Sequence, residues 1–247
     1  MRPLPLLVLL ATLALAAMGY LVPFDGYNDG QVPIPQTDPA VQPARWAFSI
    51  WGLIFLWLAA SAAFGLWRRQ GSPAWDRVRP ALLGSLVVGI AWLPVARASA
   101  LWATLLIALM AALAIVALLR SPRGHLPLPS RPDPDRWLLR EPLGLYAGWL
   151  TAASFVSLGS AGGGYGLLDP LAWAYLGVAG TAVVAVLVLL RRPDATFYAL
   201  GVIWAVFGIL AKPGQADTWL QPLGIVAMVL ALALAWGGAW GPRGRLG

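Results

Sequence analysis

The sequence has 247 residues, of which 60% are hydrophobic and only 11% are charged. A soluble domain carries roughly 25% charged residues, so lipid must be the solvent for most of this apolar surface. The lack of cysteine excludes disulfides, thiolate catalysis and cysteine-based metal sites. The net charge of +7 does not indicate nucleic-acid binding, because no basic run reaches five residues and no binding motif is present.

A transmembrane helix needs about 20 mostly apolar residues to cross a hydrocarbon core of about 30 Å. Eight segments meet this criterion, although the third and the seventh are short. They are Leu4–Val22, Ala47–Trp67, Ala81–Val95, Ala98–Leu119, Pro142–Ser160, Leu171–Leu190, Phe197–Ala211 and Trp219–Trp240. The first also resembles a signal peptide, but its apolar run continues through Val22, which favours a retained helix. The sequence therefore predicts an all-α integral membrane protein with about eight transmembrane helices.

The placement of basic residues supports this count. With both termini in the cytoplasm, all but three of the 17 basic residues fall in predicted cytoplasmic segments. The exceptions are Arg45, Arg97 and Lys212. Because cytoplasmic loops are enriched in Lys and Arg, one helix more or fewer would invert the later loops and destroy the pattern. The expected location is the bacterial inner membrane.

The sequence predicts the structure of three connections between these spans. The third and fourth spans are joined around Pro94 and Arg97, which predicts a tight helical hairpin with Arg97 at the outer interface. The proline-rich cytoplasmic segment 120–141 is expected to be extended. The glycine-rich stretch SAGGGYG (160–166) is expected to form a flexible outside turn.

Ionisable side chains are rare in the predicted spans. None of the spans contains Asp, Glu, Lys or His, and the single histidine, His125, lies in the proline-rich loop. Charged residues at membrane depth usually mark proton relays and ion pathways. Their rarity argues against a proton-coupled transporter and against an enzyme, and no metal site or catalytic residue is predicted.

Aromatic and small residues recur at helical spacing on two predicted spans. Phe48, Trp51 and Phe55 share one face of the second. One face of the fifth holds Tyr146, Trp149, Ala153 and Ser157. Gly148 and Ala152 lie beside that face and permit close helix approach. Such aromatics either fill the space between helices or leave a flat slot for a planar ligand, and the spacing does not distinguish the two.

Three motifs on these helices resemble the TspO family of translocator proteins, also called tryptophan-rich sensory proteins. The second span opens with PARWAFSIWGLIF (43–55), the third contains GIAWLP (89–94), and the fifth contains PLGLYAGWLTAASFVS (142–157). They occur in the family's order. Trp46 and Trp51 are five residues apart, whereas the family usually has six.

The resemblance implies a TspO-like core of five helices over residues 1–160, followed by three additional helices and a short cytoplasmic tail over residues 161–247. Typical members are described as binding porphyrins, including haem, so a porphyrin is an implied ligand rather than a required cofactor. The residues expected to line the pocket are Trp46, Phe48, Trp51, Phe55, Trp92, Tyr146, Trp149, Ala153 and Ser157.

The leading interpretation is a small-molecule-binding membrane protein of TspO type, which senses or carries a tetrapyrrole or another planar hydrophobic ligand. A permease for a neutral solute and an accessory membrane subunit without a ligand remain as alternatives. The expected partners are the lipid bilayer and a hydrophobic small molecule, with a homodimer as a further option, and nucleic acid is not expected.

Overall fold

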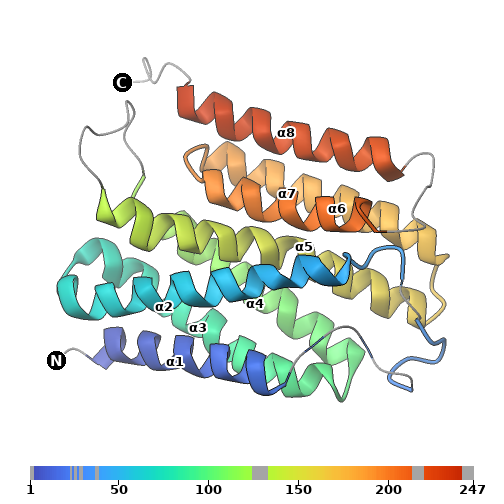
Figure 1. Ribbon diagram of the computed structural model, residues 1–247, viewed down its shortest axis with the longest axis horizontal. Helices are drawn as coiled ribbons and strands as arrows, with labels where there is room; N and C mark the ends of the chain where they lie inside the picture. Colours follow the sequence, from blue (N-terminus) through green and yellow to red (C-terminus); the bar gives the residue numbers. More distant parts are fainter. Residues whose placement is uncertain are drawn as a thin grey trace.

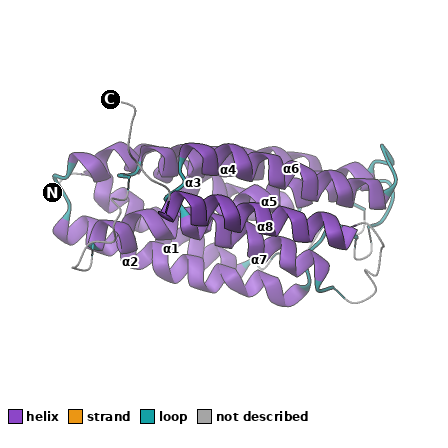
Figure 2. Cartoon of the chain, turned by 90° about the horizontal axis from the view of Figure 1, so that it is seen from above, coloured by secondary structure: helices purple, strands orange, loops and turns teal. Residues whose placement is uncertain are grey.

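A computed structural model describes residues 3–22, 24, 27, 30–36, 39–123, 133–212 and 220–240. Eight α-helices occupy this part of the chain and run roughly along one long axis (Figures 1 and 2). They are α1 (Pro3–Leu21), α2 (Ile50–Arg68), α3 (Pro73–Ala96), α4 (Ala100–Arg120), α5 (Glu141–Gly164), α6 (Pro170–Arg191), α7 (Thr196–Leu210) and α8 (Leu220–Trp240). A 3-10 helix (Arg45–Ser49) precedes α2, and a π-helix (Arg136–Arg140) precedes α5. The all-α prediction is confirmed.

Helix α5 is the centre of the bundle. It packs against α2, α4, α6 and α7, and all its residues from Glu141 to Ala152 are buried. Five helices are long and apolar enough to cross a membrane: α1, α2 with its 3-10 turn, α3, α4 and α6. Helix α5 is rich in glycine, alanine and serine, since protein rather than lipid covers it. Helices α1 and α8 lie at opposite edges of the bundle (Figure 1).

One large hydrophobic cluster extends through the bundle, beside two smaller ones in the described part of the chain. It takes buried side chains from every described helix, for example Val8, Ile54, Leu86, Ile107, Leu150, Leu189, Val202 and Ala231. Helices α6 to α8 therefore share their core with the first five. Helix α5 itself continues to Gly164, past the division expected at residues 160 and 161, and that division stays a prediction.

The third helix is longer than predicted. It begins at Pro73 rather than at Ala81 and therefore contains Asp76 and Arg79. Proline suits the first turn of a helix, where its missing N–H is not needed. The buried Arg79 side chain pairs with Asp76 and donates to the carbonyl oxygens of Gly65 and Arg69, both at 2.9 Å. A charged residue can lie inside this helix because its partners satisfy it.

The hairpin between α3 and α4 agrees with the prediction. Helix α3 ends at Ala96 and α4 begins at Ala100, with Arg97 exposed in the turn. Ser99 caps α4, because its hydroxyl accepts from the backbone N–H of Trp102 at 3.4 Å. Arg97 is thus at the end of the helix pair, where its charge can reach water and headgroups.

The glycine-rich stretch at the end of α5 is not a flexible turn. Residues 160–164 are helical, and the turn follows them. A Cβ atom at Gly162 would lie 2.2 Å from the Trp173 ring, and one at Gly164 would lie 2.6 Å from Val32. Glycine is needed at these helical positions because a side chain would collide with α6 or with the chain before α2. Only Gly166, at φ +67°, needs the conformational freedom of glycine in the turn.

The proline-rich segment 120–141 is not extended throughout. Residues 136–140 form the π-helix that leads into α5, while 124–132, and with them His125, lie outside the described residues. The guanidinium of Arg136 donates to the carboxylate of Glu141 at 2.9 Å. This short-range pair supports the helical turn despite the prolines before it.

A buried ion cluster holds one end of the bundle together. We call this the arginine-rich end; it includes the α2–α3 turn, the start of α5 and the α6–α7 linker (Figure 1). Asp194 accepts from Arg192 at 2.9 and 3.1 Å, and Arg140 lies 3.5 Å from the same carboxylate. Arg192, which is fully buried, also donates to the backbone oxygen and the hydroxyl of Ser121 at 3.1 and 3.0 Å. Helices α4, α5, α6 and α7 are therefore joined by charges rather than only by apolar contacts.

Candidate functional site

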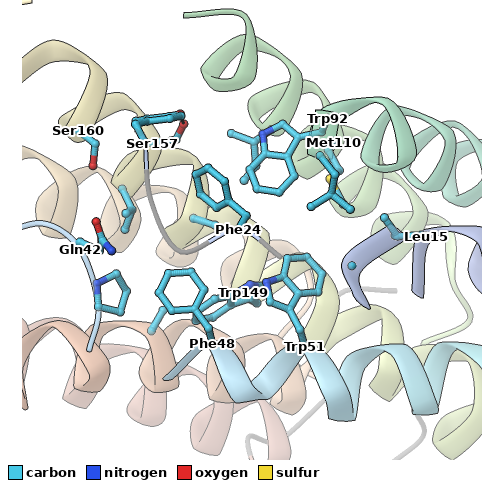
Figure 3. Close-up of a pocket in the computed structure, with 18 of the residues that line it drawn as sticks. Leu15, Phe24, Gln42, Phe48, Trp51, Trp92, Met110, Trp149, Ser157 and Ser160 are labelled. Carbon is cyan, nitrogen blue, oxygen red and sulfur yellow. Dashed lines mark hydrogen bonds between the residues drawn. The ribbon is translucent and has the colours of Figure 1, made fainter. Parts of the chain in front are cut away.

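A cavity of about 220 Å³ lies between α1, α2, α3, α4 and α5 (Figure 3). Its walls are mostly aromatic and aliphatic, with a few hydroxyl and amide groups. They comprise Leu15, Gly19, Phe24, Tyr27, Gln42, Pro43, Phe48, Trp51, Phe55, Trp92, Leu93, Ile107, Met110, Trp149, Ala153, Val156, Ser157, Ser160 and Ala205. The aromatic faces of α2 and α5 thus border an open space in this structure rather than filling it.

Most of the residues expected at the site do line this cavity. They are Phe48, Trp51, Phe55, Trp92, Trp149, Ala153 and Ser157. Figure 3 shows Phe48 of the 3-10 helix and Trp51 of α2 projecting toward Trp149 of α5. The rings of Phe48 and Trp149 meet edge to face at 5.7 Å, and Trp51 stacks on Phe55 at 5.1 Å. Helical periodicity brings these rings together because each set occupies one face of its helix.

Trp46 does not line the cavity. It belongs to the 3-10 helix before α2, so α-helical spacing does not place it on the same face as Trp51. The 3-10 helix directs Trp46 away from the cavity, where it is 44% exposed and meets the rings of Trp204 and Phe207 edge-on or tilted at 5.3 and 5.7 Å. Its neighbours are therefore on α7.

Tyr146 also lies outside the cavity lining, one turn of α5 before Trp149. Its ring is fully buried and contacts Trp51 at 6.4 Å, and its hydroxyl is 3.0 Å from that of Ser85 on α3. Tyr146 thus packs edge to face against the ring of Trp51 and links α5 to α3. It positions a wall residue instead of forming the wall.

The segment between α1 and α2 supplies lining residues that the sequence did not reveal. Phe24 packs edge to face on Trp92 at 4.9 Å. The hydroxyl of Tyr27 bonds to that of Ser157 and lies 3.3 Å from that of Thr104, and Ser157 and Thr104 are 2.9 Å apart. Burial raises the pKa of Tyr27 above its ordinary value, more than its two hydrogen bonds lower it, so the phenol stays neutral. The only available signal was two aromatics in a loop rich in Pro and Asp.

Other lining residues come from α1 and α4. Leu15 and Gly19 form part of the wall on α1, and Ile107 and Met110 form part of it on α4. A Cβ atom at Gly19 would lie 2.8 Å from the ring of Phe55. Apolar residues of this kind look the same in sequence whether they face lipid, core or cavity. Among the described residues, no cluster of His, Cys, Asp or Glu could hold a metal ion.

The comparison with protein families agrees with the three motifs and with the all-helical bundle. A family model described as TSPO-like protein matches residues 3–240. The chain belongs to this TSPO-like family. The match includes α6, α7 and α8 as well as the helices that surround the cavity. Comparisons of the TSPO-like chain with curated proteins and with solved structures give no match.

Proposed function

We propose that this TSPO-like membrane protein binds a planar hydrophobic small molecule in the cavity between α2, α3 and α5. The observation that carries the proposal is the enclosure of an open space by indole and phenyl rings, including those of Trp51, Phe55 and Trp92. A flat ring would bury its faces against these side chains, and each aromatic pair contributes about 0.5–1.5 kcal/mol beyond area burial.

The polar groups of the cavity favour binding over catalysis. The described lining contains hydroxyl and amide side chains but no acidic, basic or histidine side chain. Hydrolysis and proton abstraction require a nucleophile and a base within reach of the substrate. We therefore propose a non-enzymatic role, as a sensor or carrier of the ligand.

The size of the cavity restricts the ligand. Pockets for drug-sized ligands measure roughly 300–1,000 Å³, and this cavity measures about 220 Å³. A compound of two or three fused rings fits this space as it stands. A tetrapyrrole, the ligand class implied by the family resemblance, is larger than this space, so we expect the cavity walls to move apart when it binds.

Titration with protoporphyrin tests this function. We expect saturable quenching of tryptophan fluorescence at micromolar concentrations or below. Trp51→Ala and Trp149→Ala should each weaken binding tenfold or more, which corresponds to about 1.4 kcal/mol. Trp67→Ala is the matched control, because Trp67 is also on α2 but is 82% exposed and outside the cavity. Equal losses in all three variants would indicate partitioning into a tryptophan-rich surface, and no saturation in the parent protein would remove the tetrapyrrole.

We further propose that the protein lies in the bacterial inner membrane with its arginine-rich end in the cytoplasm, as the positive-inside rule predicts. The chain has no native cysteine, so single cysteines report orientation. Gly71→Cys, in the α2–α3 turn, should be protected from impermeant thiol reagents in intact cells. Leu167→Cys, in the exposed turn after α5, should be labelled. The reverse pattern would show the opposite orientation, and labelling at both positions would contradict the helix count.

A further inference from the structure

Arginines outnumber acidic residues at the arginine-rich end of the bundle. The arginines that form ion pairs there are buried or half-buried: Arg69, Arg79, Arg136, Arg140 and Arg192. The remaining arginines are all exposed, and none of them has a carboxylate partner within the described residues: Arg68, Arg77, Arg120, Arg123 and Arg191. The described surface of this end therefore carries an excess of positive charge.

Three of the exposed arginines gather where the end of α4 meets the end of α6. The guanidinium of Arg192, the residue after α6, donates to three carbonyl oxygens between Leu118 and Pro122 at the end of α4. This contact holds the two helix ends together. The exposed arginines that are sequence neighbours of the bonded residues, which we call the junction arginines, are Arg120, Arg123 and Arg191.

The junction arginines favour an anion with several oxygen atoms. A guanidinium presents parallel N–H donors that match the oxygen atoms of a phosphate, and the negative charge of the phosphate offsets the repulsion between neighbouring arginines. The nearby carboxylate of Asp194 does not fill this role, because it accepts from Arg192 at 2.9 Å and faces Arg140 at 3.5 Å. A phosphate group therefore complements the charge of this junction.

The surface next to the junction arginines is apolar, which points to a lipid as the source of the phosphate. Leu187 and Leu190, near the end of α6, are 48% and 63% exposed and directly precede Arg191. Helices α4 and α6 have 21 and 22 residues, lengths that just cross a hydrocarbon core, so their ends lie at headgroup depth. A headgroup at the junction would place its acyl chains against these leucines, whereas a free phosphate would leave them uncovered.

We propose that the junction of α4 and α6 binds an anionic phospholipid, such as phosphatidylglycerol, through the phosphate of its headgroup. The other exposed arginines of this end lie on different helices. Arg68, at the end of α2, lies over the ring of Trp67 at 5.5 Å, and Arg77 of α3 donates to the carbonyl oxygen of Pro73 at 3.3 Å. The site is separate from the cavity and does not depend on the cavity ligand.

A fluorophore beside the junction tests this inference, because the chain has no native cysteine. Leu187→Cys carries the fluorophore next to the junction. Ala63→Cys, which is exposed on α2 and also lies shortly before an arginine, carries it as the control position. Each labelled protein is reconstituted in phosphatidylcholine vesicles that contain a minor share of phosphatidylglycerol. Bromine on the acyl chains of one lipid or the other quenches the fluorophore when that lipid is its neighbour.

We expect phosphatidylglycerol to be favoured over phosphatidylcholine beside position 187. The preference should be about fivefold or more, which corresponds to about 1 kcal/mol, the usual contribution of an arginine near anionic lipid. At position 63 the preference should be about twofold at most, because only the general attraction of anionic lipid to basic residues acts there.

Replacement of the junction arginines should remove the preference. Arg191→Gln and Arg120→Gln should each lower it at position 187 by about threefold, and the double variant should abolish it. Arg77→Gln is the matched control, because it removes the same charge from an exposed side chain at the same end of the bundle, on α3. It should leave the preference unchanged. Since all three side chains are exposed, the variants should remain folded.

Equal preferences at positions 187 and 63 would overturn the inference, because they would show diffuse attraction to the whole basic end. An Arg77→Gln loss as large as that of Arg191→Gln would overturn it for the same reason. An excess of inorganic phosphate should not reduce the quenching by brominated phosphatidylglycerol, and a marked reduction would assign the junction to free phosphate instead. These results leave the proposed function untouched, since the protoporphyrin titration tests the cavity separately.

Discussion

Replacement of Asp194 with alanine is expected to lower the free energy of unfolding by about 3–5 kcal/mol, the usual cost of removing one partner from a buried ion pair. Asp194 neutralises Arg192, which is 0% exposed, and faces Arg140 at 3.5 Å. Without it, two buried guanidinium groups lose their shared carboxylate. The measurement is a comparison of parent and variant in detergent micelles by chemical or thermal unfolding.

Asp135→Ala is the matched control for this experiment. Asp135 also accepts from an arginine, Arg69, at 2.9 Å, but both side chains are 32% exposed. A pair of this exposure contributes about 0–1 kcal/mol, and the bond from the Trp75 indole at 3.1 Å adds about 1 kcal/mol. The control should therefore lose at most about 2 kcal/mol. Similar losses in the two variants would contradict the structural role assigned to the buried cluster.

Replacement of Gly148 with alanine is expected to destabilise the protein by about 3 kcal/mol or more, at or above the usual 1–3 kcal/mol for overpacking. A Cβ atom there would lie 2.2 Å from the carbonyl oxygen of Tyr198 on α7. The obstacle is backbone, so no rotamer change relieves it and the two helices must separate. Gly201 makes the same contact from α7, where a Cβ atom would lie 2.7 Å from the carbonyl oxygen of Leu145. Thermal unfolding in micelles measures the loss.

Gly52→Ala is the control for this variant, and we expect it to leave the stability unchanged or to raise it. Gly52 is exposed on α2, and an added Cβ atom would meet nothing within 4 Å. Alanine favours a helix over glycine by up to about 1 kcal/mol, so this variant should unfold at the same or a higher temperature than the parent. If Gly148→Ala behaved like Gly52→Ala, the close contact between α5 and α7 would be wrong.

Much of the architecture follows from local properties of the chain. Apolar runs and the distribution of arginine predict the membrane environment and the number of helices, because both can be seen from composition along the chain. Periodicity places Trp51 with Phe55, and Trp149 with Ser157, on shared helix faces. The ordered motifs predict the family that the match over residues 3–240 confirms. These features need no knowledge of which helices are neighbours.

Helix ends and charged positions were predicted less well. The expected third span omitted Asp76 and Arg79, and the expected fifth span began one residue after Glu141. A hydropathy criterion excludes charged residues from a helix, whereas the folded protein accommodates them by pairing. The buried carboxylates of Glu141 and Asp194 pair with Arg136 and Arg192, which lie just outside the apolar runs.

The sequence by itself determined that this protein is a helical membrane protein of the TSPO-like family and which faces of α2 and α5 are aromatic. Only the tertiary structure decided that these faces border an open cavity, that Phe24 and Tyr27 help to line it, and that Trp46 lies outside it. It also decided that α7 is the helix that contacts Gly148. The physical reason is that periodicity describes the direction of a side chain from its own helix, whereas a cavity, a hydrogen bond or a close contact depends on the volume and position of segments distant in the chain.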